Sequence, residues 1–338
     1  MAKLGEVCLL KAGKFVSAND ISPEYNKGLY PCFGGNGIRG YVADYTHDGE
    51  FPLIGRQGAL CGNVNLASGK FHATEHAVVV QPKIEMNVHW LYYALNAMNL
   101  GQYATGAAQP GLAVSKLETL SIEIPNISEQ NKIAQTLYKV EQLVNFRKQQ
   151  LAKLDELVKA RFVEMFGNKD YPRMKWNNVF NTTTGKLDSN AAVDNGKYPF
   201  FTCSKEPLKI DSYAFDQTAL LLAGNNAAGK YDVKYYQGKF NAYQRTYVLS
   251  LKHNWSYKLF QYQLEDKLLY LQTKSLGGLT KYLTLKILGE LDFIVPPLAL
   301  QNEFAAFVEH VDEQKQIVQQ SLEKLELMKK ALMQEYFG

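Results

Sequence analysis

The sequence has few cysteines and no long apolar run. Its four cysteines are widely spaced along 338 residues, with no CxxC pair and no histidine at metal-ligand spacing beside them. This argues against a structural zinc site and a disulfide framework. No segment approaches the roughly 18 apolar residues of a membrane span, and the N-terminus lacks the apolar core of a signal peptide. We therefore expect a cytoplasmic protein with no membrane partner.

Charge of one sign is also scarce, because 37 Lys and Arg oppose 33 Asp and Glu, for a net charge of +4. The hydrophobic content of 46% and charged content of 21% are those of a folded chain and exclude global disorder. At about 150 residues per domain, the length predicts two domains. The mild basicity is compatible with a polyanionic partner without requiring one.

Catalytic motifs are missing as well. Gly35–Gly40 fits GxGxxG, but no helix pattern follows, so it indicates a turn rather than a dinucleotide site. Gly224–Lys230 spells a phosphate-binding loop until Tyr231 replaces the Ser or Thr that would hold Mg²⁺. The six histidines form no HExxH pattern, and no Pro-Asp step is available for a common nuclease signature. We expect no catalytic residue, no metal and no cofactor on this chain.

What is present is an internal repeat of about half the chain. Gly69-Lys70-Phe71-His72-Ala73 corresponds to Gly238-Lys239-Phe240-Asn241-Ala242, and Gly55 and Gly224 lie at the same distance upstream of these two stretches. Pro125 is followed by Gln130 as Pro296 is by Gln301, and both copies close with Phe-Gly. The offset between matching residues is slightly larger in the tail than in the globular part, so a small insertion separates the two copies. The sequence therefore predicts one globular unit and one tail, written twice.

Both tails, 126–167 and 297–338, read as long helices with heptad spacing of apolar residues. A helix start signal lies at Ser128, with Glu129 in the first turn. Basic residues interrupt the apolar series at different places: Arg147 and Arg161 in the first tail, Lys315 and Lys329 in the second. The first tail carries seven basic and five acidic residues, the second four and seven. Opposite charge favours pairing of the two tails as an antiparallel coiled coil; packing of each helix on its own globular unit is the alternative.

The globular units read as mixed α/β. Strands are predicted at 51–54, 77–80, 219–222 and 246–249, and short helices at 90–95 and 259–262. The predicted fold class is α+β, with two tandem mixed α/β recognition domains, each followed by a long helix. The predicted boundaries are domain 1 at 1–125, helix 1 at 126–167, domain 2 at 168–296 and helix 2 at 297–338.

Polar side chains suited to base edges and phosphates gather in the predicted loops. Arg and Lys pair with guanine, Asn and Gln with adenine, and all of them bind phosphates. An ordinary solvated loop surface explains any single one equally well. The candidates for DNA binding are Arg39, Arg56, Gln57, Asn63, Lys70 and His72 in the first unit, and Asn225, Asn226, Lys230, Lys239, Gln244 and Arg245 in the second.

The doubled order of these motifs resembles the specificity subunits of type I restriction–modification systems. The residues that carry the resemblance are Ile124-Pro125 with Glu129-Gln130, Val295-Pro296-Pro297 with Gln301, Leu53–Gly58, Gly69–Phe71 and Thr105–Gln109. The resemblance implies a non-catalytic subunit in which each domain reads one half of a split site in double-stranded DNA. It also implies paired helices that dock two methylation subunits, which carry S-adenosylmethionine and modify adenine. Restriction subunits, with ATP and Mg²⁺ expected on the partners, would complete the complex.

Two other classes of function stay open from the residues alone. The first alternative is a stand-alone DNA-modifying enzyme, either a methyltransferase or a nuclease. The absence of catalytic motifs argues against it. On the other alternative it is a coiled-coil adaptor that binds proteins only. Salt-dependent DNA binding separates the second alternative from the specificity subunit.

Overall fold

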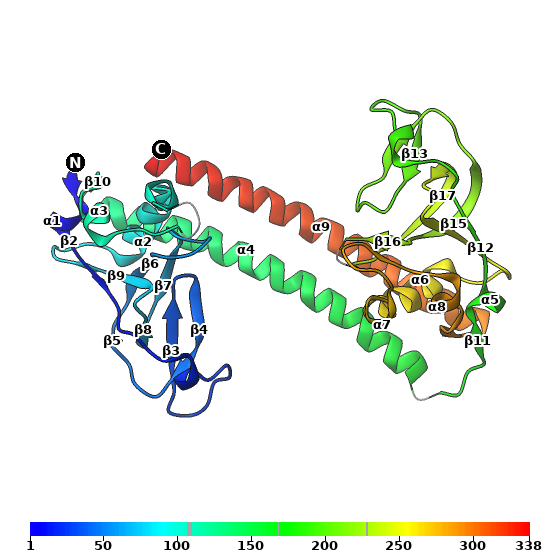
Figure 1. Ribbon diagram of the computed structural model, residues 1–338, viewed down its shortest axis with the longest axis horizontal. Coiled ribbons are helices and arrows are strands. Elements are labelled where there is room, and N and C mark those ends of the chain that lie inside the picture. Colours follow the sequence, from blue (N-terminus) through cyan, green and yellow to red (C-terminus); the bar gives the residue numbers. More distant parts are fainter. Residues whose placement is uncertain (107–109, 168, 228) are drawn as a thin grey trace. The chain divides into compact units, whose positions relative to one another are not determined.

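The computed structural model describes residues 1–106, 110–167, 169–227 and 229–338. The chain forms two compact units (Figure 1): unit 1 contains Met1–Gln149 and Gln319–Gly338, and unit 2 contains Gln150–Val318. Each unit thus combines one globular part with a stretch of both long helices. The predicted tandem arrangement of mixed α/β parts and long helices is confirmed.

Unit 1 contains two small sheets and three short helices before the first long helix. One sheet has the strand order β2-β9-β6-β7 and the other β4-β3-β8-β5, while β1 pairs with β10. The elements are β1 (Ala2–Lys3), α1 (Leu4–Val7), β2 (Cys8–Ala12), β3 (Tyr30–Gly34), β4 (Gly37–Val42), β5 (His47–Asp48), β6 (Phe51–Gly55), β7 (Val64–Ala67), β8 (Lys70–Ala73), β9 (Ala77–Pro82), α2 (Val88–Ala97), α3 (Val114–Glu118) and β10 (Ser121–Ile122).

Strands β6 and β9 are apolar on both faces because each face covers its own part of the core. Ile54 and Val78 belong to the larger cluster, which also contains Trp90 and Leu95 of α2. Leu53 and Val79 point to the other face, where they pack with Phe33 and Phe71. Side chains alternate along a strand, so these two adjacent strands separate the two clusters. The predicted strands at 51–54 and 77–80 and the predicted helix at 90–95 are confirmed.

Unit 2 repeats this plan with one continuous sheet, of strand order β12-β18-β15-β17-β13-β14. The ten-residue strand β17 takes the place of β7 and β8. In unit 1 the two strands are separated by a turn at Gly69, whose φ of +73° suits glycine. The elements are β11 (Arg173–Lys175), α5 (Trp176–Val179), β12 (Phe180–Thr184), β13 (Tyr198–Phe201), β14 (Leu208–Ile210), β15 (Phe215–Ala223), β16 (Asn225–Asn226), β17 (Val233–Ala242), β18 (Thr246–Leu251), α6 (Tyr257–Asp266), α7 (Leu268–Lys274), β19 (Lys281–Tyr282), α8 (Leu285–Gly289) and β20 (Asp292–Ile294).

The prediction that the small insertion separates the two copies is wrong; the insertion lies within unit 2, beside α7. Helices α2 and α6 are related by the smaller offset of the globular part, whereas α3 and α8 are already related by the larger offset of the tail. Between them, unit 1 has a 3₁₀ turn at Leu100–Tyr103, where unit 2 has the seven-residue helix α7. The predicted strands at 219–222 and 246–249 and the helix at 259–262 are also confirmed. Only Gly35 and Asn36 of the GxGxxG segment form the predicted turn, because Gly37–Gly40 already belong to the strand β4.

The long helices are α4 (Ile127–Phe162), which continues as a π-helical turn over Val163–Gly167, and α9 (Leu298–Phe337). The start signal predicted at Ser128 is wrong. Asn126 caps α4 instead, because its Oδ1 accepts a hydrogen bond of 3.0 Å from the backbone N–H of Glu129. Ser128 lies inside the first turn, where its hydroxyl has no capping role.

A buried glutamine fixes the start of each long helix. In unit 1 the side-chain amide of Gln130 donates to the carbonyl of Pro125 (2.9 Å) and accepts from the backbone N–H of Asn87 (2.9 Å). In unit 2 Gln301 donates to Pro296 (2.7 Å) and accepts from Ser256 (3.0 Å). Asn87 and Ser256 are the N-cap residues of α2 and α6. The Pro-x-x-x-x-Gln spacing therefore joins the two helix starts through an amide whose donor and acceptor are both satisfied.

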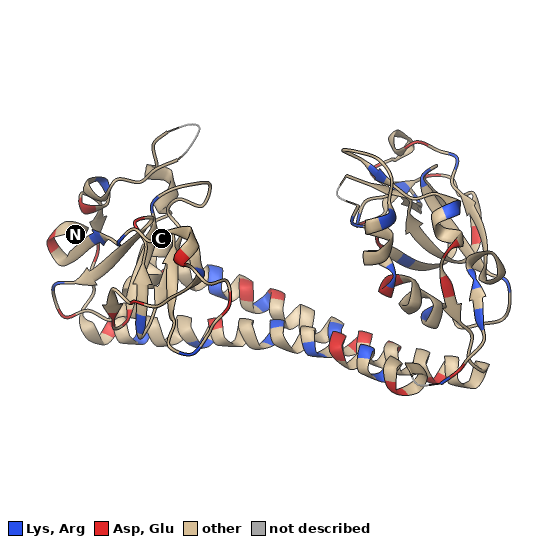
Figure 2. Ribbon diagram, turned by 60° about the horizontal axis from the view of Figure 1, so that its bottom comes forward, with Lys and Arg blue, Asp and Glu red and all other residues tan. Residues whose placement is uncertain are grey.

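The two long helices run in opposite directions within each unit. In unit 1, Glu141 of α4 binds Lys329 of α9 (2.7 Å), and Lys148 binds Glu326 (3.0 Å). In unit 2, Asp155 binds Lys315 (2.5 Å) and Arg161 binds Glu303 (2.7 Å). Rising numbers in α4 meet falling numbers in α9, so the stretches are antiparallel. Figure 2 shows basic and acidic residues interspersed along both helices.

The basic residues that interrupt the heptads all contact the other helix. Arg147 donates its Nε–H to the hydroxyl of Ser321 (3.1 Å), and Arg161, Lys315 and Lys329 bind carboxylates. The apolar heptad positions are buried, as predicted: Ile133, Leu137, Val140, Val144 and Val158 in α4, and Phe304, Val308, Val311, Val318 and Leu322 in α9. The described part of the chain contains no helix that is both long enough and apolar enough to cross a membrane.

Candidate nucleic-acid interface

Three backbone segments meet at one edge of unit 1. They are the turn after β3 (Gly34–Gly37), the segment that ends β6 (Gly55–Gln57) and the turn between β8 and β9 (Thr74–His76). Thr74 N–H donates to Phe33 C=O and Arg56 N–H donates to His76 C=O, both at 2.9 Å. A Cβ on Gly55 would collide with the carbonyl oxygen of Gly35, so only glycine permits this approach. We call these three segments the loop edge of unit 1.

The loop edge carries several of the side chains predicted from the sequence. Gln57 and Asn63 are exposed, and the Asn63 amide donates to the Asn36 side chain (2.8 Å). Arg56 is half-buried, and its Nε has no hydrogen-bond partner among the described residues. Arg39 is exposed on β4 and lies beside Gly34. Amides and guanidinium groups at this edge supply both donors and acceptors, which is the chemistry of base-edge recognition.

Unit 2 builds the corresponding loop edge with backbone contacts that match those of unit 1 in part. Tyr243 N–H donates to Phe201 C=O (2.9 Å), as Thr74 does to Phe33. The donor to Arg245 C=O (2.8 Å) is Gly224, the counterpart of Gly55, rather than the counterpart of Arg56. The segments are Phe201–Cys203, Gly224–Asn226 and Tyr243–Arg245. Gln244 and Arg245 are exposed, and the Gln244 amide donates to Asp188 (3.2 Å). Asn225 and Asn226 are half-buried, and Lys230 is exposed on the loop that follows them.

A fourth segment at this edge was not identified from the sequence as a site. In unit 2, Asn225 pairs with Tyr282 and Asn226 with Lys281, as strands β16 and β19. In unit 1, Gln57 forms a bridge to Gly111 in the corresponding place. Thr105–Gln109 was noted only for its resemblance, and its residues 107–109 lie outside the described part of the chain. The pairing joins segments that are far apart in the sequence, so no local pattern predicts it.

Lys70 and Lys239 lie a few residues before the loop edges: Lys70 begins β8, and Lys239 lies within β17. In the sheet register, Lys70 lies opposite Asp48 of β5, and Lys239 lies opposite Asp216 of β15. Each ammonium also lies over a tyrosine ring, Tyr45 and Tyr213 respectively, at 4.7 Å from the ring centroid in both units. Both lysines remain exposed. The repeat therefore preserves this Lys–Tyr pair, while the loop edges differ in side chains.

His72 has a different environment from the other candidates. Its side chain is only 8% exposed, and its Nε2 lies 3.2 Å from the carbonyl oxygen of Lys14. The ring is thus held inside unit 1 by the segment after β2. We leave His72 out of the exposed candidate surface, which retains the other eleven predicted residues.

Two groups that could take part in chemistry, the Cys61 thiol and the Tyr231 hydroxyl, are buried. Burial raises the pKa of the Cys61 thiol and of the Tyr231 hydroxyl, so both are held in their protonated forms. Tyr231 is 7% exposed and belongs to the core of unit 2. The phosphate-loop-like segment before it leads into the strand β17 rather than a helix. Within the described ranges, no group of three or more His, Cys, Asp or Glu is placed to hold a metal ion.

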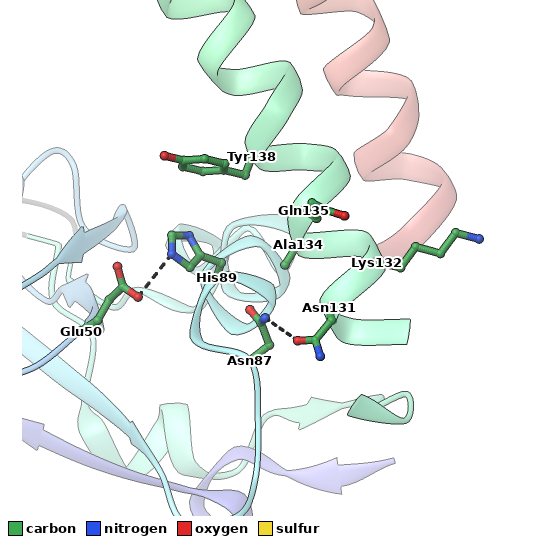
Figure 3. Close-up of a pocket in the computed structure, with 8 residues that line it drawn as sticks. All are labelled: Glu50, Asn87, His89, Asn131, Lys132, Ala134, Gln135 and Tyr138. Atoms are coloured by element: carbon green, nitrogen blue, oxygen red, sulfur yellow. Dashed lines mark hydrogen bonds and ion pairs between the residues drawn. The ribbon is translucent and has the colours of Figure 1, made fainter. Parts of the chain in front are cut away.

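A cavity of about 660 Å³ lies where α2 and α4 begin in unit 1 (Figure 3). Its polar side chains bind one another: Asn87 donates to Asn131 (2.7 Å), and His89 lies 3.3 Å from Glu50. The corresponding cavity in unit 2, of about 390 Å³, has Lys258 in place of His89 and Glu309 in place of Tyr138. Because the charge and the type of the lining side chains differ between the copies, the cavity is not a repeated binding site.

The long helices expose apolar residues that do repeat. Phe146 and Ile317 occupy the same repeat position and are 59% and 61% exposed. Leu157 and Met328 occupy another shared position, and both are 47% exposed. Phe146 and Met328 lie in unit 1, and Ile317 and Leu157 lie in unit 2, so each unit carries one residue of each shared position. Exposed apolar residues on a helix are typical of a protein-docking surface.

Comparison with known proteins agrees with this arrangement. The family model described as "Type I restriction modification DNA specificity domain" matches residues 1–156 and 168–327. The Type I restriction enzyme EcoprrI specificity subunit of Escherichia coli is 53% identical over 143 residues, 42% of this chain and 36% of that protein. The EcoDI specificity subunit of the same organism is 51% identical over 80 residues, 24% of this chain and 17% of that protein.

The chain therefore matches 36% and 17% of the length of these two curated relatives. The fold is shared along the whole chain with a solved structure. The crystal structure of a type I restriction–modification S subunit from M. genitalium superposes with a TM-score of 0.73 at 18% identity, covering 99% of this chain and 95% of that one.

Proposed function

Because the chain belongs to the type I restriction modification DNA specificity family, we propose that it is the DNA-reading, non-catalytic subunit of a type I restriction–modification complex. The observation that carries the proposal is the doubled loop edge. Both units join its segments by a hydrogen bond to the carbonyl of Phe33 or Phe201 and by a second one to the carbonyl of His76 or Arg245, and each equips it with different polar side chains. A constant scaffold with variable base-reading groups is what recognition of two different half-sites requires.

The two globular parts, 1–125 and 168–296, would each bind one half-site in double-stranded DNA. The eleven exposed or half-buried candidates would contact the DNA. Arg39, Arg56, Gln57 and Asn63 in unit 1, and Asn225, Asn226, Lys230, Gln244 and Arg245 in unit 2, would read bases or bind nearby phosphates. Lys70 and Lys239 recur with the same tyrosine contacts, which suits the sequence-independent phosphates.

The segments 126–167 and 297–338 would pair along their length as an antiparallel coiled coil and set the gap between the half-sites. The ion pairs between α4 and α9 support this role. The repeated exposed pairs, Phe146 with Ile317 and Leu157 with Met328, would receive two copies of one methylation subunit, since equivalent patches fit equivalent partners. S-adenosylmethionine, ATP and Mg²⁺ would be carried by the methylation and restriction subunits in the cytoplasm.

The test uses the full chain expressed with the methylation subunits of its own system. Mapping methylated adenines in DNA exposed to the complex should give a split site with two different halves. Binding to that site should weaken steeply as salt rises, because each neutralised phosphate releases counterions. A continuous or symmetric site, or binding that does not depend on salt, would contradict the proposal.

A further inference from the structure

The segment that pairs with Asn225 and Asn226 in unit 2 is a short hairpin, Leu276–Tyr282. Leu276 and Tyr282 exchange both backbone hydrogen bonds, at 3.0 and 2.9 Å. Gly277 has a φ of +100°, and a Cβ there would collide with the carbonyl oxygen of Thr280. The turn therefore requires glycine at this position. We call this segment the 276–282 hairpin.

The tip of the 276–282 hairpin presents a leucine to solvent. Leu279 is 94% exposed, the most exposed leucine of the described residues. Leu276, at the base of the hairpin, is 48% exposed. A leucine without folded contacts gains nothing for the stability of unit 2. The hairpin that carries it is paired, through Lys281 and Tyr282, with Asn226 and Asn225 of the loop edge.

The surroundings of this leucine are basic. From Lys267 to Gly289 the chain has four lysines and no acidic residue. Lys281 lies on the hairpin and pairs with Asn226, and Lys274 ends the helix that precedes it, where its ammonium lies 5.5 Å from the Tyr270 ring centroid. Lys230 lies on the facing loop, next to Gly229, which approaches the Lys281 side chain. An exposed apolar tip on a hairpin that carries a lysine, with further lysines on the neighbouring helix and loop, fits a polyanion with an apolar interior.

The corresponding stretch of unit 1 has neither feature. Residues 96–118 contain one lysine and one glutamate, and the segment 105–111 contains no leucine. A partner protein that binds in two identical copies would need this patch in both units. The segment occupies the same place in both units, but its leucine and lysine occur only in unit 2. This is expected if these side chains read only the half-site of unit 2.

We propose that Leu279 inserts into a base step of the half-site that unit 2 reads, while Lys274 and Lys281 bind the flanking phosphates. This proposal rests on the proposed function and adds a specific recognition element to it. Apolar side chains that enter between bases partly unstack them and kink the duplex, and the resulting fit depends on how easily that step deforms. The lysines contribute affinity that is independent of sequence.

The experiment uses the complex with methylation subunits and duplexes that carry the mapped site or a scrambled unit 2 half-site. 2-Aminopurine replaces single adenines near that half-site, because its fluorescence rises when its base unstacks. We expect one position to brighten with the wild-type complex and not with Leu279→Ala. The variant should lose about tenfold in affinity for the mapped site and less than about twofold for the scrambled one.

Leu269→Ala is the matched control. Leu269 is also exposed, at 77%, but it lines a different cavity with Asp155 and Lys258. It should leave both readouts unchanged. Lys274→Ala and Lys281→Ala should weaken binding to both duplexes alike and flatten the salt dependence.

If Leu279→Ala keeps the wild-type affinity ratio or the wild-type fluorescence pattern, the proposal for Leu279 is wrong. The specificity function stands in that case, because the wild-type complex still separates the two duplexes. A wild-type complex that does not separate them refutes the proposed function itself.

Discussion

Unit 1 and unit 2 are most alike where backbone meets backbone and least alike where side chains meet solvent. The carbonyls of Phe33 and Phe201 accept the same hydrogen bond, from the turn after β8 and from the turn after β17. Gln130 and Gln301 make the same pair of contacts. At the exposed edge, by contrast, Gln57 of unit 1 has Asn226 as its counterpart, and the 276–282 hairpin carries Lys281 where unit 1 has Pro110. Duplication has kept the parts that position a loop and varied the parts that the loop presents.

The largest expected effect is a complete change of one half-site. Replacing residues 170–294 by the corresponding segment of another family member should alter the half-site read by unit 2 and leave the other half unchanged. The reason is that each loop edge is built from its own unit's segments. Mapping of methylated adenines measures both halves at once. If both halves change together, the two units do not read DNA independently.

Replacing either buried glutamine should lower the free energy of unfolding more than the other substitutions considered below. Gln130→Leu and Gln301→Leu each leave a proline carbonyl and an N-cap N–H without a partner, so we expect a loss of about 2–4 kcal/mol in each unit. Denaturant unfolding followed by circular dichroism measures this loss. Gln135→Leu is the control, because Gln135 is exposed on the same helix. Losses below about 1 kcal/mol would show that this shared contact is not a support for the scaffold.

Several features were predictable because they depend on neighbours in sequence. The heptads of α4 and α9 and the apolar runs of β6, β9, β15 and β18 are local patterns, and the structure contains each of them. The Pro-x-x-x-x-Gln spacing was visible too, but its function was not, because the donor partners Asn87 and Ser256 lie far upstream in the sequence. The cap at Asn126 was missed because Ser128 is an equally good capping residue and only the backbone geometry chooses between them.

The candidate site was predicted in part for the same reason. Gln57, Asn63, Gln244 and Arg245 were recognisable as polar residues in loops, and they do lie at the loop edges. The burial of His72 follows from the segment near Lys14, which no pattern around His72 reveals. The 276–282 hairpin was missed because its pairing with Asn225 and Asn226 is a contact between distant segments.

A smaller effect is expected at the polar contacts between the long helices, which differ between the units. In unit 1 the carboxylate of Glu141 accepts from Tyr93 (2.9 Å) and from Lys329 (2.7 Å). Burial, and next the Glu141 charge, raise the pKa of Tyr93, so its hydroxyl stays protonated and donates. Lys329→Met should destabilise unit 1 by about 1–2 kcal/mol, because a half-buried carboxylate loses its cation.

Thermal unfolding measures this change, with Lys330→Met as the control because Lys330 is exposed beside it. The double variant Glu141→Leu, Lys329→Met should recover most of the loss, since an apolar pair replaces both charges. An equal loss in the double variant would show that Glu141 is held mainly by Tyr93.

The smallest expected effect concerns a carboxyl group that unit 2 has and unit 1 lacks, since Asn96 corresponds to Glu265. Glu265 is exposed, but partial desolvation by its neighbours raises the pKa of its carboxyl group, and the Gln261 side chain, which donates to it (2.8 Å), only partly offsets this. A raised folded pKa means that the ionised form is less stable in the folded unit than in the unfolded chain. This cost is full above the raised pKa and disappears as pH falls to the ordinary range of a glutamate, near about 4.3.

Glu265→Gln should therefore stabilise unit 2 at neutral pH by less than about 1 kcal/mol, and the gain should vanish near pH 4. Thermal unfolding at both pH values measures it. Glu313→Gln is the control, because the Glu313 side chain is 73% exposed. A gain that persists unchanged at pH 4 would mean that the substitution acts through packing rather than through the charge. In that case this contrast between the units would be steric, and their electrostatic difference would rest on the helix ion pairs alone.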